Sequence, residues 1–110
     1  MNNKNIIMQG DSYSITISID FNGKPIDIST VDAIQFVVGD LIKYYKSDGS
    51  GEVSYDNDNK YFIFPISQQE SFGFNGIVNT QIRVKGIDGS IKGKNGDPIC
   101  LILSRTKEEI

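Results

Sequence analysis

The chain has no histidine and no tryptophan, and it has one cysteine and three prolines among its 110 residues. Without an imidazole, a Ser-His-Asp or Cys-His relay cannot be built, and zinc and iron sites lose their commonest ligand. A single cysteine forms no intrachain disulfide, and Cys100 lies in the apolar run 99–103, where a thiol behaves as a small hydrophobic group. We therefore expect no catalytic residue, no cofactor and no metal.

Charge and hydropathy limit the partners. The net charge is −3 and the isoelectric point is near 4.8, which argues against a nucleic-acid partner, because such binding depends on neutralising phosphates. No apolar run approaches the ~18 residues of a membrane span, and the first eight residues are too short and too polar for a signal peptide. We expect a single domain over residues 1–110, made in the cytoplasm, with no membrane partner.

Alternation with a period of two is the clearest structural signal. From Ser12 to Phe21 apolar and polar residues alternate almost without a break, and the same pattern runs from Val78 to Lys85. Asn22-Gly23 follows the first run and favours a type I′ hairpin turn, and Asp88-Gly89 follows the second. Two further runs, 61–66 and 98–103, are apolar at every position, which predicts central strands covered on both faces.

Residues 31–45 allow two interpretations. Apolar residues at three- and four-residue spacing after Ser29-Thr30 fit an amphipathic helix. The β-branched and aromatic content of 34–38 and the Gly39-Asp40 turn signal favour two strands instead. Ser67 and Glu70 have the spacing of a capping box, which predicts one short helical turn.

These signals predict an all-β fold, a single immunoglobulin-like antiparallel β-sandwich of about seven to nine strands with at most one short helical turn. The expected core consists of alternating strand residues, namely Ile15, Ile17, Ile19, Phe36, Phe64, Ile82, Val84, Leu101 and Leu103.

Acidic residues cluster at predicted turns. Asp56-Asn57-Asp58-Asn59 resembles the start of a calcium-binding loop, but Tyr61 stands where that loop needs glycine and Ser67 where it needs glutamate. A polar hairpin loop is the favoured interpretation. The remaining candidates for paired carboxylates, Asp11, Asp20, Asp27 and Asp32, also lie at strand ends, where aspartate is common for local hydrogen bonding.

The order of elements resembles a known family, the small β-sandwich of bacteriophage tail and baseplate proteins, typified by the N-terminal domain of phage baseplate upper proteins. The likeness is carried by short motifs along most of the chain: 9–12, 22–29, 34–38, 66–72, Gly76, 80–84, Asp88-Gly89 and Glu109-Ile110. Ser71, where threonine is usual, and the stretch 93–96 depart from the family pattern. The resemblance implies a bacterial protein that is assembled, in multiple copies, into a virion or tail-like particle through contacts with other tail or baseplate proteins.

Three functions follow from these observations. The first is a structural component of a phage or prophage-derived tail or baseplate. The second is a carbohydrate-binding module for host-surface glycans, and the third is an immunoglobulin-like domain that inhibits or tethers an enzyme. For the first, we expect the strands at 5–8 and 78–85 to be open sheet edges, the outward Gln81 and Arg83 to bind a partner, and the segments 1–7 and 104–110 to act as arms.

Overall fold

The computed structural model describes residues 5–110, and in this range about half of the residues lie in strands, which make up most of the regular secondary structure. The first half contains β1 (Asn5–Met8), β2 (Tyr13–Ile17), β3 (Asp20–Phe21), β4 (Lys24–Pro25), a 3-10 turn (Ile28–Thr30), β5 (Val31–Val38), β6 (Leu41–Lys46) and β7 (Ser54–Asp56). The second half contains β8 (Tyr61–Ile66), α1 (Gln68–Phe72), β9 (Ile77–Val78), β10 (Thr80–Gly86), β11 (Ile91–Asn95) and β12 (Ile99–Ile102). The predicted all-β class is confirmed.

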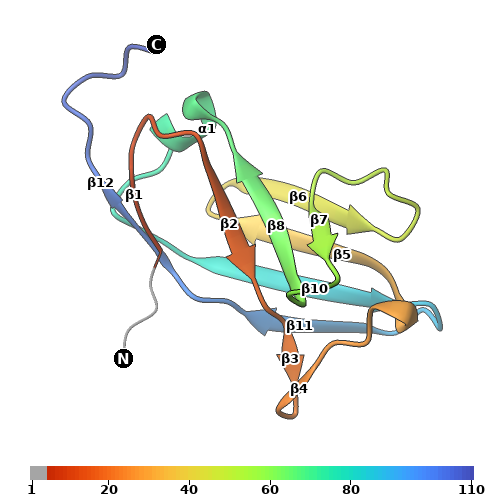
Figure 1. Cartoon of the computed structure of the whole chain (residues 1–110). Helices are drawn as coiled ribbons and strands as arrows, with labels where there is room; N and C mark the ends of the chain where they lie inside the picture. Colours follow the sequence, from red (N-terminus) through yellow and green to blue (C-terminus); the bar gives the residue numbers. More distant parts are fainter. Residues whose placement is uncertain (1–4) are drawn as a thin grey trace.

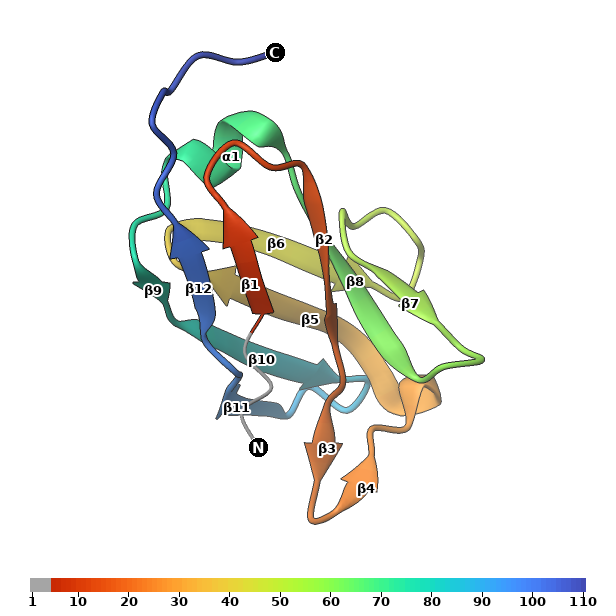
Figure 2. The same cartoon turned by 60° about the vertical axis from the view of Figure 1, so that its left-hand side comes forward.

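The strands form two layers (Figures 1 and 2). One layer is a four-stranded antiparallel sheet in the order β11-β10-β5-β6. The other layer is divided between the sheet β2-β8-β7 and the sheet β1-β12-β9, and the small β3-β4 ribbon projects from one end.

Aromatic rings join the two layers at the centre of the core. Phe36 of β5 lies 5.5 Å from Phe62 and 6.3 Å from Phe64 of β8, measured between ring centroids, and all three side chains are fully buried. Tilted and edge-on ring pairs at such distances add to the stabilisation from burial. Most of the predicted core is confirmed, but Ile17 is only half-buried. The prediction that Leu103 belongs to the core is wrong, because this residue lies beyond the end of β12 and is 63% exposed.

The predicted turns are confirmed. Asn22 and Gly23 both have positive φ, at 54° and 78°, as a type I′ turn between β3 and β4 requires. Residues 31–46 form two strands around Gly39-Asp40, not a helix, and the Asp88-Gly89 turn links β10 to β11.

The continuous strand expected from Ser12 to Phe21 is wrong in its second half. β2 loses its partner after Ile17, which pairs with Phe62 near the start of β8. The strand is interrupted at Ser18 and Ile19, and Phe21 then pairs with Lys24 in the separate β3-β4 ribbon.

The capping box at α1 is also confirmed and is part of a larger contact. The Ser67 hydroxyl accepts from the Glu70 N–H, and the Glu70 carboxylate accepts from the Ser67 N–H. The same carboxylate is 2.9 Å from the Lys43 ammonium, which also donates to the Pro65 carbonyl. Lys43 therefore ties β6 of one layer to the end of β8 in the other.

β1 and β12 pair in parallel, which is a departure from the antiparallel sandwich that the sequence predicted. β8 and β12 are the central strands of their sheets, as expected. The prediction that β12 is covered on both faces is wrong, because Ile99 and Leu101 are buried while Ile102 is 53% exposed. The outer face of this sheet is open.

Candidate functional site

Gln81 and Arg83 lie two residues apart on β10 and both are exposed on the outer face of the four-stranded sheet. Arg83 donates to the Gln35 side-chain carbonyl at 3.2 Å, and Gln81 donates to that of Asn95 at 3.4 Å. These hydrogen bonds run across neighbouring strands, so both side chains support the sheet itself. Their role as partner contacts stays a prediction.

The expectation that 78–85 is an open edge is wrong from Thr80 onward, although Val78 lies in β9, which is the edge strand of its sheet. β10 pairs with β5 along one side and with β11 along the other, so its backbone groups are already used within the sheet. The expected edge at 5–8 does exist, since β1 ends its sheet. It is partly closed by Asp11, whose carboxylate accepts from the Met8 N–H at 3.0 Å and whose own N–H donates to the Met8 carbonyl.

Exposed apolar side chains gather on the outer face of the β1-β12-β9 sheet. Strand register places Ile6, Cys100 and Ile77 in one row across the three strands, and Met8 and Ile102 in the next row. These five residues are named here the apolar face. Ile6 and Ile77 are 64% and 63% exposed, and Met8 and Ile102 are 45% and 53% exposed. Cys100, at the middle of the first row, is half-buried.

The inner side of the same sheet explains why the strands are apolar at every position. Ile7 on β1, Val78 on β9 and Leu101 on β12 belong to the buried core. The strands thus need apolar residues on the inner face, and the outer face has them as well. The sequence run 98–103 carried this signal, but it was interpreted as a strand that the chain itself covers on both faces.

Other exposed apolar side chains are more widely placed. Ile42 is on β6, Ile87 is in the β10-β11 turn and Ile91 is on β11, and their exposed fractions are 53%, 72% and 64%. Single exposed apolar residues are normal on protein surfaces, whereas contiguous patches mark contacts. Ile42 and Ile91 are therefore matched controls for Ile102 and Ile77, with nearly the same exposed fractions.

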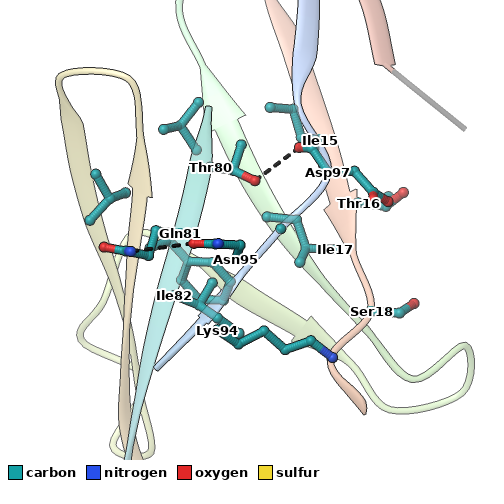
Figure 3. A pocket seen from close by; sticks show the side chains of 14 residues that line it. Ile15, Thr16, Ile17, Ser18, Thr80, Gln81, Ile82, Lys94, Asn95 and Asp97 are labelled. Atoms are coloured by element: carbon teal, nitrogen blue, oxygen red, sulfur yellow. Dashed lines mark hydrogen bonds between the residues drawn. The ribbon is translucent and has the colours of Figure 1, made fainter. Parts of the chain in front are cut away.

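A cleft opens where the second layer is divided, between β2 and the β10-β11 pair (Figure 3). It has a volume of about 380 Å³, with Ile15, Ile17 and Ile82 among its apolar lining residues and with Thr16, Gln81, Asn95 and Asp97 among its polar ones. Thr80 donates to the Asp97 carbonyl at 2.9 Å, and Lys94 donates to the Asp20 carbonyl. The only aromatic residue lining it is the fully buried Phe36, so the cleft lacks the exposed aromatic platform on which sugars commonly stack.

The acidic residues at the turns serve the turns. The hydroxyl and N–H groups of Ser29, Ser50 and Ser90 hydrogen-bond to the aspartate two residues earlier, and these bonds lower the pKa of Asp27, Asp48 and Asp88. Hydrogen bonds from the Asn59 side chain and N–H likewise lower the pKa of Asp56, as expected of a polar hairpin loop. Asx turns of this kind hold the carboxylate in its charged form.

Within residues 5–110, no three His, Cys, Asp or Glu side chains are grouped so that they could hold a metal ion. In the same range no helix is long and apolar enough to cross a membrane. Comparisons with protein-family models, with curated proteins and with solved structures find no significant match.

Proposed function

We propose that this protein is a structural component of a larger assembly, of the kind formed in phage or prophage-derived tails and baseplates, and that it acts through protein–protein contacts. The observation that carries the proposal is the apolar face. The resemblance of the sequence motifs to small baseplate sandwiches supports the type of assembly.

The size of the apolar face makes it suitable for a contact. On ordinary side-chain areas the exposed fractions of Ile6, Met8, Ile77 and Ile102 amount to roughly 400 Å² of apolar surface. At about 25 cal/mol per Å², covering this surface stabilises a complex by about 10 kcal/mol before the costs of association. Those costs are ~4–15 kcal/mol, so a partner must also make contacts beyond the apolar face.

The rest of the structure favours a rigid contact surface. β1 is held in place by its pairing with β12, by the Asp11 contacts at its end, and by Gln9, whose buried side chain bonds to the loop after α1 and to Ser104. A surface that is ordered before binding loses little conformational entropy when a partner covers it. The position of the apolar face on a regular sheet thus supports binding by shape and burial.

The experiment is incorporation into purified particles produced from the natural locus. Ile102→Lys places a charge on the apolar face, and Ile42→Lys places the same charge at a site of equal exposure on the opposite layer. We expect Ile102→Lys to be lost from the particles and Ile42→Lys to be retained. If no particle contains the wild-type protein, the proposed function is wrong.

One double variant tests the contact residues predicted from sequence. Gln81→Ala combined with Arg83→Ala alters the outer face of the four-stranded sheet without touching the apolar face. Loss of this double variant from the particles supports a contact at Gln81 and Arg83. Normal incorporation excludes it and leaves the apolar face as the contact.

A further inference from the structure

We propose that the partner covering the apolar face is a second copy of this chain, packed face to face about a two-fold axis. This inference rests on the proposed function only in using the same surface. It goes further by naming the occupant.

Charge favours a second copy on this face over contact elsewhere. The chain carries a net charge of −3, so like net charge opposes the association of two copies. The five positions of the apolar face hold Ile, Met and Cys only, so two such faces meet without an unpaired or like-charged group. The face is therefore complementary to itself.

The edge of the sheet favours stacking over extension. Two copies could also join β1 to β1 and form one continuous sheet, since edge strands pair readily with each other. Asp11 opposes this, because its carboxylate and N–H already occupy the backbone groups of Met8. Packing of one face on the other leaves these bonds intact.

Stacking places the two central strands over each other. Cys100 lies on β12, between Ile6 and Ile77, at the middle of its row. Stacked sheets lie ~10 Å apart, so a two-fold axis through the middle of the face brings the two Cys100 side chains toward each other. Cys100 is the only cysteine, which makes a covalent link between copies a direct report of this geometry.

The area predicts the strength of the dimer. Two copies cover roughly 800 Å² of apolar surface between them, and polar surface beyond the apolar face would have to supply the rest of the ~1,200 Å² total that marks the lower end of stable interfaces. We therefore expect a weak dimer with a dissociation constant of about 10–100 µM. The high local concentration in an assembly of many copies would shift the equilibrium from monomer to dimer.

The test is sedimentation velocity of the whole chain from about 5 µM to about 500 µM, a range that brackets the expected dissociation constant. Wild type is expected to shift from monomer to dimer. Ile102→Lys is expected to stay monomeric, while the control Ile42→Lys dimerises like wild type. If Ile102→Lys fails to fold, Ile77→Lys and its control Ile91→Lys, at 63% and 64% exposure, replace the pair.

A short bismaleimide is applied to the same samples. We expect it to link Cys100 to Cys100 in wild type and in the control, but not in the face variant. Wild type that stays monomeric at about 500 µM overturns the proposal. A dimer that Ile102→Lys leaves intact and that Cys100 does not link also overturns it. A dimer absent from particles contradicts the proposed function alone, and a monomer present in particles contradicts this inference alone.

Discussion

Gln9 is a buried side chain whose removal should be costly, and the structure shows where the cost arises. Only 2% of the residue is exposed. Its amide nitrogen donates to the Phe74 carbonyl, and its carbonyl accepts from the Ser104 N–H at 3.0 Å and from the Lys107 ammonium at 2.7 Å. One side chain thus fastens the end of β1 to the loop after α1 and to the segment after β12.

The cost of Gln9→Ala follows from the partners that it abandons. Phe74 is buried, so water does not replace the hydrogen bond that its carbonyl loses. Leaving this buried carbonyl without a partner costs about 1–3 kcal/mol. Ser104 is partly buried and Lys107 is exposed, so water replaces much of what they lose. With the small cavity left by the truncated side chain, we expect the free energy of unfolding to fall by about 2–4 kcal/mol.

Gln9→Met separates hydrogen bonding from packing, since methionine keeps the volume and removes the polar atoms. We expect it to cost nearly as much as Gln9→Ala. The assay is urea unfolding followed by far-UV circular dichroism. Limited trypsin digestion is the second readout, and cleavage after Arg105 and Lys107 should become faster in both variants. A loss below ~0.5 kcal/mol for Gln9→Ala, which is typical of a surface substitution, would refute the reasoning.

The remaining predictions concern the core, a charged contact, a close approach and the turn acids. Ile82→Ala, at a site 4% exposed, should lower the free energy of unfolding by about 2–4 kcal/mol, Ile17→Ala by about half of that, and Leu103→Ala by less than ~0.5 kcal/mol, all measured by urea unfolding. Burial opposes the charge on Glu70, but the hydrogen bond from the Ser67 N–H and the Lys43 ammonium outweigh it, so the pKa of Glu70 lies below its ordinary value of 4.5. The stability that Glu70 contributes is therefore present above that ordinary value and is lost as pH falls through the lower folded pKa; Glu70→Gln should flatten the stability profile in this acidic range, and an unchanged profile would contradict the contact. Gly51→Ala should destabilise by about 1–3 kcal/mol, because its Cβ would stand 2.1 Å from the Tyr44 carbonyl oxygen, whereas Gly49→Ala meets no atom within 4 Å and should cost about 1 kcal/mol for its φ of +83° alone. Thermal unfolding should be unchanged by a chelator, and a drop of many degrees would show that Asp56 and its neighbours bind an ion.

Local signals in the sequence predicted the local structure well. Asn22-Gly23 fixes its own turn through the positive φ of both residues, and the Ser67–Glu70 capping box needs only a spacing of three. The strands of the β10-β5-β6 meander follow from alternation and from the Gly39-Asp40 turn. In each case the residues that determine the structure lie close together in the sequence.

Long-range pairing could not be predicted in the same way. β1 pairs in parallel with β12 across almost the whole chain, and no turn between them sets the register. The alternating pattern of β10 correctly predicted that Ile82 and Val84 are core residues, but it could not show that β11 and β5 flank the strand. The candidate site depended on this information, because the apolar face exists only when Ile6, Ile77 and Ile102 are brought together by pairing.

The central claim is that the apolar face is open in the isolated chain and covered in the assembly. Hydroxyl-radical footprinting of the dilute protein and of purified particles reports the two states, with Met8, Ile77 and Ile102 as reporters on the face and Ile42 and Ile91 as internal references of similar exposure. We expect all five residues to be oxidised in the dilute protein, and in purified particles we expect the three face residues to be protected several-fold while the references change little. Equal oxidation of the face residues in both samples would contradict it.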